Sequence, residues 1–305
     1  MKVLIVARCK NGHYAPFITE QVSALEKVGV ECRYFPMGER GMTGYLRRLP
    51  ALRREIRIFA PDIVHAHYGL CGLFANLQRS IPVVTTYHGS DINDKRVRKF
   101  SRFAIRLSAF NIFVSQKNID LAKPRRNFAL IPCGINLEDY PLMEKNEARQ
   151  MMGMDLNKKY VLFAGAFDNP VKNYPLAQSA MDLVPEVELM ELKGYSRLQV
   201  SALMQAVDVF LMTSHTEGSP QVIKEAMACD CPIVSVDVGD VKDLIHGIKG
   251  CYLAEKEPAY IADKIKEAIA FSERTRGKEV IIGRGLTNDS LVGNIVNVYR
   301  KICCR

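Results

Sequence analysis

Short apolar runs alternate with longer amphipathic segments along the whole chain. The run KVLIVA at 2–7 precedes ITEQVSALEKVG at 18–29, in which apolar residues recur at helical spacing before Gly29. Buried strands of parallel sheets form continuous apolar runs, whereas an apolar residue at every third or fourth position indicates a helix. The pattern therefore predicts a β-strand followed by an α-helix at the start of the chain.

The same alternation continues to the end of the chain. Further strand-like runs in the first half are VECRYFPM (30–37), PDIVHAHY (61–68), IPVVTTYHG (81–89), FNIFVS (110–115) and FALIPCG (128–134). Those in the second half are YVLFAG (160–165), VELMELKG (187–194), DVFLMTS (208–214), CPIVSVD (231–237) and GCYLAE (250–255), with helical patterns at 175–184, 196–207, 220–229 and 258–273. This order predicts an α/β fold with a parallel, doubly wound sheet in each half.

A polar stretch at 142–159 separates the two halves. We therefore expect a first domain at 1–141, a linker at 142–159 and a second domain at 160–285. The last residues, 286–305, form an amphipathic pattern that predicts a terminal helix. Two sheets of this kind leave a cleft, and open α/β sheets bind ligands beyond the carboxyl ends of their strands.

Composition excludes several classes of protein. Hydrophobic residues make up 48% and charged residues 25%, which is typical of a globular protein. No apolar run approaches the roughly 20 residues that span a bilayer, and the first residues read as a strand rather than a signal. The nine cysteines have no metal-site or disulfide spacing, which favours reduced thiols in the cytoplasm.

Positive charge is concentrated in the first half. Residues 1–150 hold 24 Lys and Arg against 13 Asp and Glu, whereas residues 151–305 hold 18 against 20. Two segments, TGYLRRLPALRREIRIF (43–59) and DKRVRKFSRFAIRLS (94–108), interleave basic and apolar residues at helical spacing. Such helices can lie on an anionic membrane surface, although an ordinary helix with a solvated basic face has the same pattern. No nucleic-acid motif accompanies the charge, so nucleic acid is not an expected partner.

One segment, SHTEGSPQVIKEAMACDCPIVS from Ser214 to Ser235, carries a candidate binding site. We expect Ser219 to cap a helix that begins at Pro220, and its first N–H groups and dipole would attract phosphate. Glu217 and Glu225 would be repelled by phosphate but would accept hydrogen bonds from a vicinal diol. A nucleotide sugar has a diol at each end and phosphate between them. The alternative is that both glutamates are exposed and only keep the segment soluble.

These residues resemble the E-x7-E signature of retaining glycosyltransferases of family 4, which have the GT-B fold. The segments PDIVHAHYG, YHGSDI, FVSQ, LIPCGIN and PIVSVDVGDVKDLI also fall where such enzymes have comparable segments, so the resemblance covers nearly the whole chain. It implies two Rossmann-like domains facing a cleft. It also implies that the terminal helix packs back on the first domain.

The resemblance also assigns roles in donor binding. Glu225 would hold the ribose hydroxyls, Glu217 would contact the transferred sugar, and the turn Gly218–Pro220 would present backbone N–H groups. Lys172 would neutralise the leaving diphosphate, where negative charge develops during the reaction. The alternative for Lys172 is a solvated side chain at the start of a helix.

One position departs from the family pattern. An arginine is expected just after the glycine of the strand, but Ala166 stands there, with one extra residue before Lys172. Either another basic residue replaces the arginine, or activity is weaker, or the donor sits differently.

Four positions in the first half are candidate site residues. By resemblance, Gly12 allows close backbone approach near the donor phosphates, and His88 lies beside the reacting sugar. Asp91 either binds the acceptor or orients its loop, and His67 lines the acceptor side. A purely structural role is the alternative for both histidines.

The expected activity follows from these assignments. We expect a retaining transfer of sugar from a UDP- or GDP-sugar to a glycan or lipid-linked acceptor, in surface polysaccharide or glycolipid assembly on the cytoplasmic side of the membrane. No Asp-x-Asp occurs, which agrees with catalysis without metal or other cofactor, and no Gly-x-Gly-x-x-Gly follows the first strand, which argues against a nicotinamide enzyme. A degenerate member that binds a sugar nucleotide without transfer is the alternative.

Overall fold

The computed structural model describes residues 1–38 and 41–304, without the side chains of 41–43. The chain forms two compact units. Unit 1 takes in Met1–Gly134 and the stretch from Asn288 onward, and unit 2 takes in Ile135–Thr287.

Unit 1 is built on six parallel strands in the order β2-β1-β3-β4-β5-β6. The strands are β1 (Lys2–Arg8), β2 (Glu31–Met37), β3 (Ile63–His67), β4 (Val83–Tyr87), β5 (Phe110–Phe113) and β6 (Phe128–Leu130). All residues of β3, β4 and β5 are buried, and the polar ones among them, such as His65 and Thr86, make hydrogen bonds within the unit.

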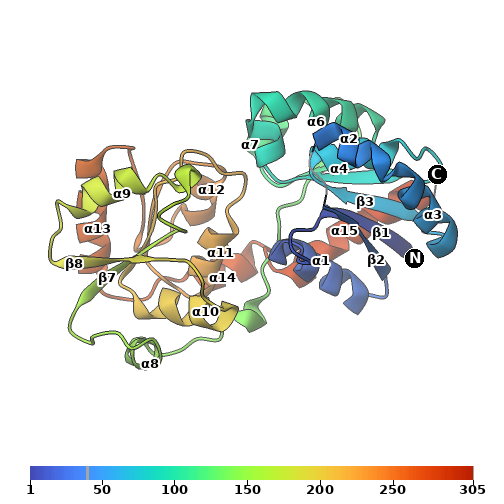
Figure 1. The fold of residues 1–305 in the computed structure, drawn as a ribbon. Helices are drawn as coiled ribbons and strands as arrows, with labels where there is room; N and C mark the ends of the chain where they lie inside the picture. Colours follow the sequence, from blue (N-terminus) through green and yellow to red (C-terminus); the bar gives the residue numbers. More distant parts are fainter. Residues whose placement is uncertain (39–40, 305) are drawn as a thin grey trace. The chain divides into compact units, whose positions relative to one another are not determined.

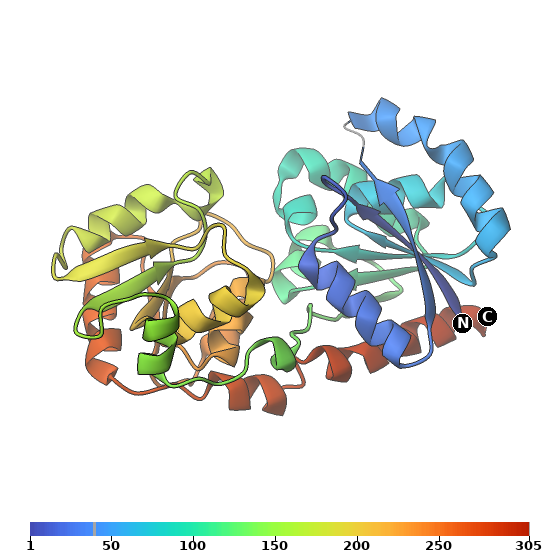
Figure 2. The ribbon, with the colours of Figure 1, turned by 60° about the horizontal axis from the view of Figure 1, so that its bottom comes forward.

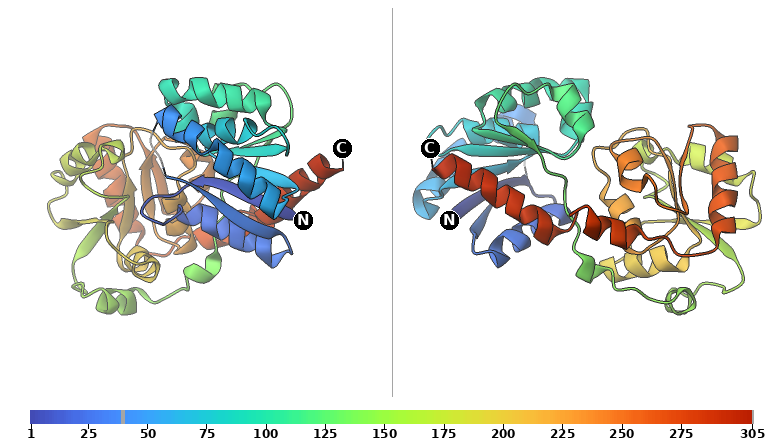
Figure 3. Two further views of the ribbon diagram at one scale, coloured as in Figure 1. Left: turned by 45° about the vertical axis from the view of Figure 1, so that its right-hand side comes forward. Right: turned by 180° about the vertical axis from the view of Figure 1, so that it is seen from behind.

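Helices cover both faces of this sheet (Figure 1). On one face, α1 (Pro16–Lys27) packs beside α15 (Asn288–Cys303), and Figures 2 and 3 show α15 running along unit 1. The other face is covered by α3 (Leu49–Phe59), α4 (Gly69–Asn76), α6 (Lys95–Leu107) and α7 (Gln116–Ala122), with the short helices α2 (Gly41–Arg47) and α5 (Ser90–Asn93) in the connections. The last helix is therefore part of the core of unit 1.

Unit 2 is built on five parallel strands in the order β11-β10-β9-β7-β8. The strands are β7 (Lys159–Phe163), β8 (Val187–Glu191), β9 (Val209–Met212), β10 (Ile233–Val236) and β11 (Cys251–Ala254). Helices α9 (Tyr174–Met181) and α13 (Pro258–Phe271) pack together on one face, and α10 (Arg197–Ala206), α11 (Gln221–Ala228) and α14 (Gly277–Gly283) lie on the other (Figure 1). The remaining elements are η1 (Leu137–Asp139), α8 (Lys145–Met151), η2 (Pro170–Lys172) and α12 (Val241–Ile245). The two parallel sheets expected from the alternating pattern are confirmed.

The stretch 142–159, expected as a linker, lies within unit 2, and the chain changes unit at Gly134–Ile135 instead. The polar composition of this stretch suggested an exposed linker, but one of its charged side chains, Arg149, is buried in unit 2. Arg149 of α8 is only 3% exposed, donates to the carbonyl of Ala206 at 2.9 Å and pairs with Asp208 at 3.0 Å. A paired, buried guanidinium thus anchors α8 to the sheet.

Asp208 is the centre of this cluster. It also accepts hydrogen bonds from Lys145 at 2.7 Å and from the backbone N–H of Tyr160 at 2.8 Å. Burial alone would raise the pKa of Asp208, but these donors outweigh it and leave the pKa below its ordinary value.

Substituting Asp208 should therefore destabilise unit 2. Asp208→Asn leaves the Arg149 guanidinium buried without a counter-charge, and we expect a loss of about 3–5 kcal/mol in the free energy of unfolding. Urea denaturation followed by circular dichroism measures this loss. Glu188→Gln, which breaks the exposed Lys158–Glu188 pair, is the control and should leave the midpoint almost unchanged. Equal effects of the two substitutions would contradict the assignment.

Candidate functional site

In unit 2, the candidate residues gather where two neighbouring strands end. Strands β7 and β9 are adjacent, but the helices that follow them, α9 and α11, lie on opposite faces of the sheet. A doubly wound sheet leaves its carboxyl edge uncovered at such a switch point, and ligands bind there. The loop after β7 carries Lys172, and the loop after β9 carries Glu217.

Lys172 and Glu217 form an ion pair. The Lys172 Nζ lies 2.8 Å from Glu217 Oε1, which also accepts a hydrogen bond from Ser214 Oγ at 2.9 Å. Both side chains of the ion pair are less than one-fifth exposed. Gly165 has a φ of +152°, and a Cβ there would lie 3.1 Å from the Lys172 side chain, so the missing side chain makes room for the lysine.

Further hydrogen bonds fix the two loops to each other. Thr213 Oγ1 donates to the carbonyls of Lys172 and Asn173, both at 3.0 Å, and the N–H of His215 donates to the carbonyl of Val171 at 2.9 Å. The position of the Lys172 ammonium is therefore set by backbone contacts as well as by Glu217.

Helix α11 begins at Gln221, one residue later than the sequence predicts. Pro220 occupies the N-cap position with an extended ψ of 114°, and no side chain caps the helix. The expectation that Ser219 caps the helix is wrong, because Ser219 Oγ accepts a hydrogen bond from Lys224 Nζ at 3.1 Å instead. Glu225 lies half-buried on α11.

Lys224 stabilises the turn at 218–220 through hydrogen bonds. Its side chain is fully buried, and Nζ donates to Gln221 Oε1 at 3.1 Å as well as to Ser219. Burial raises the pKa of nearby Asp240, while the charge of Lys224 and a hydrogen bond with Ser219 work to lower it. A Cβ on Gly239 would lie 2.7 Å from the carbonyl oxygen of Gly218, so the loop after β10 packs directly against the turn.

In unit 1, a cavity of about 790 Å³ lies at the carboxyl ends of β1, β3 and β4. Its lining includes Arg8, Lys10, His13, Tyr14, Tyr68 and Asp91. Residues 10–13 form a two-residue hairpin turn, with Lys10 and His13 exchanging backbone hydrogen bonds at 2.9 Å. Asn11 and Gly12 have φ of 51° and 82°, the conformation that Asn-Gly adopts in such turns. The turn therefore explains Gly12 without a ligand.

Asp91 holds two loops together. Its carboxylate accepts hydrogen bonds from the backbone N–H groups of Gly69 at 2.8 Å and of His88 and Gly89 at 3.1 Å. Burial raises the pKa of Asp91 to about 6, although these three donors oppose the shift. The contacts are those of the loop-orienting alternative, although Asp91 also borders the cavity.

Three histidines form a stack beneath this edge of the sheet. His65 bonds to the hydroxyls of Tyr299 on α15 and of Thr86 on β4. The His67 ring stacks on His65 with centroids 4.6 Å apart, and His67 Nδ1 lies 3.0 Å from His88 Nε2. His67 is fully buried, so the expectation that it lines the acceptor side is wrong. His88 is half-buried.

The contacts of His67 determine which nitrogen of His88 carries the proton. His67 Nε2 is buried without a hydrogen-bond partner among the described residues. A buried N–H without a partner is costly, so neutral His67 carries its proton on Nδ1 and donates it to His88 Nε2. His88 then carries its own proton on Nδ1, which lies 3.6 Å from Cys133 Sγ. His67 thus positions the donor group of His88.

Two features of the described residues bear on cofactors and membranes. No three His, Cys, Asp or Glu side chains in this part of the chain are grouped so as to hold a metal ion. No helix within residues 1–38 and 41–304 combines the length and the hydropathy needed to cross a bilayer.

Comparison with known proteins identifies the family. Residues 3–139 match the model described as Glycosyltransferase Family 4, and residues 161–270 match the model described as Glycosyl transferases group 1. Together the two ranges cover most of the chain. The chain belongs to glycosyltransferase family 4 and has the GT-B fold.

A curated relative agrees with this assignment. TuaC of Bacillus subtilis, which is provisionally named a teichuronic acid biosynthesis glycosyltransferase, is 27% identical to this chain over 235 residues. That alignment covers 67% of this chain and 60% of TuaC. The chain spans about 60% of the length of the first curated relatives it matches.

Solved structures show the same fold. Sucrose-phosphate synthase from Thermosynechococcus elongatus superposes with a TM-score of 0.85 at 14% identity, over 99% of both chains. Alr3699/HepE of Anabaena, solved in complex with UDP, superposes with a TM-score of 0.77 at 16% identity, over 99% of this chain and 100% of that one.

The position at which the resemblance implies an arginine holds Ala166, which carries no charge. Ala166 contributes only a backbone carbonyl, which accepts from Asn169 at 3.1 Å. The two basic residues that follow Lys172 in sequence pair with carboxylates: Lys193 with Asp168 at 2.9 Å and Arg197 with Asp139 at 2.8 Å. The sequence pattern does not single out Lys224, which is a buried cation near the turn. A lysine within the apolar run of α11 is the feature that could have indicated it.

The histidine stack predicts a loss of stability in acid. Burial lowers the pKa of His67 to about 3, and burial and neighbouring histidines hold the pKa of His65 and His88 well below 6.5. Unfolded chains bind these protons first, so stability present above pH 6.5 is lost as pH falls, by up to about 1.4 kcal/mol per pH unit for each histidine. Asp91 has the opposite effect between about pH 6 and 4, but it is one group against three.

Hydrogen exchange of β3 and β4 peptides, corrected for intrinsic rates, measures this effect between pH 7.5 and 5. We expect protection in unit 1 to fall with pH. His246→Asn, which removes an exposed histidine of unit 2, should leave the fall unchanged. Protection that stays constant over this range would contradict the buried, neutral state of the stack.

Proposed function

We propose that this chain is a retaining glycosyltransferase that moves a sugar from a nucleoside-diphosphate sugar to an acceptor hydroxyl. The observation that carries the proposal is the grouping of Lys172, Glu217 and the start of α11 at the switch point of unit 2. Family membership supports it, and the complex of HepE with UDP shows that a protein of this fold binds a nucleoside diphosphate.

The donor binds with its diphosphate at the positive end of the site. Phosphate is attracted by the first N–H groups of α11 and by the Lys172 ammonium. Glu217 takes hydroxyls of the transferred sugar, and Glu225, about one turn along α11, takes those of the ribose. The ion pair with Glu217 holds Lys172 in place before the donor arrives, which reduces the entropy lost on binding.

The reaction exchanges one bond at the anomeric carbon. The bond from C1 to the diphosphate oxygen breaks, the bond from C1 to the acceptor oxygen forms on the same face, and the acceptor proton passes to the leaving diphosphate. Lys172 stabilises the charge that develops on the diphosphate. His88, at the carboxyl edge of unit 1, acts in its neutral form, and its Nδ1 carries the proton that it can donate.

The missing arginine is offset by Lys224. This buried ammonium lies beneath the turn that carries Gly218 and Ser219, where it adds positive charge to the start of α11. Because the site is poorly solvated, a charge held there acts on phosphate more strongly than an exposed one would.

The acceptor binds in the cavity of unit 1. The cavity mixes tyrosine rings with basic and polar side chains, a composition suited to a sugar with apolar faces and hydroxyl groups. The name of TuaC favours a surface polysaccharide as the product.

A second candidate function is binding of a sugar nucleotide without transfer. Ala166, in place of the arginine, is the observation that favours it. The two functions differ in one measurement, release or transfer of sugar in the presence of acceptor.

We also propose that unit 1 rests on an anionic membrane on the cytoplasmic side. Unit 1 holds 25 Lys and Arg against 10 Asp and Glu, a net charge of +15, whereas unit 2 holds 17 against 23. Helix α6 exposes Phe100 and Phe103, at 38% and 55%, among its basic residues. An exposed face that combines cations with aromatic rings suits the interface of an anionic bilayer.

Incubation with radiolabelled UDP-, GDP- and ADP-sugars and a range of acceptors tests the transfer. Lys172→Met and Glu217→Gln should each lower kcat by about 10²–10³-fold, because each removes a group that acts on the reacting sugar or the leaving diphosphate. Glu225→Gln should mainly raise KM, because ribose contacts are alike in the ground and transition states. Nuclear magnetic resonance of the product gives the anomeric configuration.

Glu186→Gln, which removes an exposed carboxylate of the same unit, is the matched control and should retain full activity. Thermal shift with UDP, GDP and ADP identifies the base independently of the acceptor. Nucleotide binding with no transfer to any acceptor would support the second candidate, and inverted product would exclude the retaining mechanism.

Flotation with vesicles tests the membrane surface. Phe100→Ser/Phe103→Ser should reduce binding to vesicles that contain phosphatidylglycerol, because it removes the apolar part of the α6 face. Ile282→Ser, at an exposed position of unit 2, is the control for lost surface hydrophobicity. If both variants float as the unchanged protein does, the α6 face does not enter the interface.

A further inference from the structure

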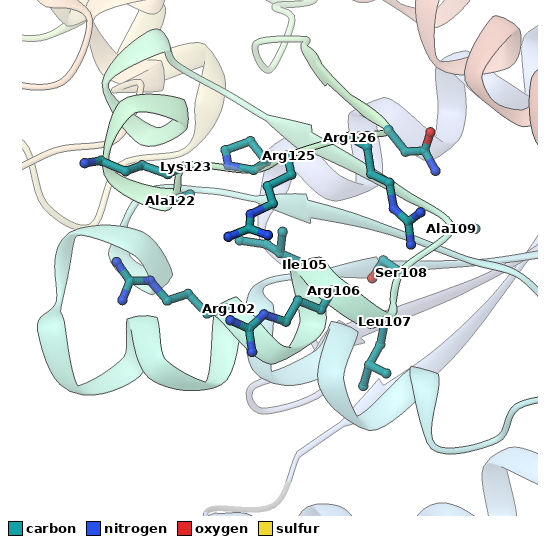
Figure 4. Close-up of a pocket in the computed structure, with 12 residues that line it drawn as sticks. Arg102, Ile105, Arg106, Leu107, Ser108, Ala109, Ala122, Lys123, Arg125 and Arg126 are labelled. Atoms are coloured by element: carbon teal, nitrogen blue, oxygen red, sulfur yellow. The ribbon is translucent and has the colours of Figure 1, made fainter.

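A second cavity in unit 1 is lined by basic side chains. It has a volume of about 890 Å³ and lies between the end of α6 and the loop that joins α7 to β6. Arg102 and Arg106 reach it from α6, and Lys123, Arg125 and Arg126 from the loop (Figure 4). Its lining contains no Asp or Glu.

The cavity lies at the opposite edge of the sheet from the acceptor cavity. Ser108 and Ala109 precede β5, and Asn127 precedes β6, so the lining gathers at the amino ends of these strands. The acceptor cavity lies at the carboxyl ends of β1, β3 and β4. The two cavities have no lining residue in common.

The five cations have no counter-charges of their own. Among the described residues, none of them makes an ion pair or a side-chain hydrogen bond, and Asp120, the acidic residue on α7, bonds to Gln116 instead. Figure 4 shows the guanidinium groups of Arg106 and Arg125 directed into the same hollow. Like charges gathered without partners repel one another, and an anion would relieve the repulsion.

Helix ends account for only part of this charge. Helices α6 and α7 both end at the cavity, and each carboxyl terminus carries about −0.5 of an elementary charge, which a nearby cation complements. The two ends together offset about one of the five positive charges, which leaves about +4. A single phosphate group carries about −1.5 to −2, so the cavity has charge for two such groups.

We propose that this cavity binds two phosphate groups simultaneously. A single arginine binds phosphate oxygens through two parallel hydrogen bonds, which lysine cannot do, and four of the five cations are arginines. The two groups are either joined in one soluble molecule or neighbouring headgroups of a lipid surface. The site goes beyond sugar transfer and does not require it.

Two double variants and one control test the site. Arg102→Gln/Arg106→Gln removes the cations of α6, and Arg125→Gln/Arg126→Gln removes two from the loop. Arg54→Gln/Arg57→Gln removes the same charge from α3, where both arginines are exposed and lie outside the cavity. All six arginines are exposed, so the fold should be retained, and circular dichroism confirms this.

Calorimetric titration with inorganic pyrophosphate is one arm, and sedimentation with phosphatidylglycerol vesicles is the other. We expect each cavity variant to weaken binding about tenfold or more and the α3 control to stay within about twofold. Binding of pyrophosphate identifies a soluble ligand, and binding of vesicles alone identifies lipid headgroups. Equal losses in the cavity variants and the control, or no binding in either arm, would overturn the proposal.

Discussion

The switch point of the unit 2 sheet, where the helices that follow two neighbouring strands lie on opposite faces, fixes the positions of Lys172, Glu217 and the start of α11. In unit 2, β7 and β9 lie side by side while their following helices leave on opposite faces, so the loops after the two strands meet at the carboxyl edge of the sheet. This is why Lys172 and Glu217, 45 residues apart, lie 2.8 Å from each other. Unit 1 repeats the arrangement at β1 and β3, where the cavity of about 790 Å³ opens.

Two buried aspartates, Asp208 and Asp91, and the half-buried Asp240 differ in how their charge is compensated. Asp208 gathers three cations, and its pKa falls below the ordinary value, so it contributes to stability at neutral pH. Asp91 has only backbone donors and Asp240 has one lysine nearby, and burial raises the pKa of both. The well-paired carboxylate anchors α8 far from the site, whereas the two less well compensated ones hold loops at the site.

The sequence predicts the sheets because most strand residues are apolar and buried. The family resemblance singles out Lys172 and Glu217, which the structure places 2.8 Å apart. The sequence wrongly predicts a linker at 142–159, which lies within unit 2, and it wrongly predicts that Ser219 caps α11. Arg149 looks like a solvated charge until Asp208, 59 residues away, is seen to pair with it. Ser219 looks like a helix cap because serine is common at that position. The sequence does not show that its hydroxyl instead accepts a hydrogen bond from Lys224. Partners set by tertiary packing are therefore invisible to local patterns, and the role of His67 as a positioning group is a further case.

Parallel α/β units also impose a polarity on charge. Their helices run opposite to their strands, so helix amino termini point to the carboxyl edge of the sheet and helix carboxyl termini point to the amino edge. The carboxyl edge therefore attracts phosphate with few basic side chains, and unit 2 forms its candidate donor site there despite a surplus of six acidic residues. The amino edge attracts cations, because helix carbonyls need them. Once more cations gather than the helix ends can neutralise, as between α6 and β6, the same edge becomes attractive to anions. The basic cavity of unit 1 thus holds more cations than the ends of α6 and α7 can neutralise. It lies at the amino edge of the sheet because the carboxyl ends of these helices point there.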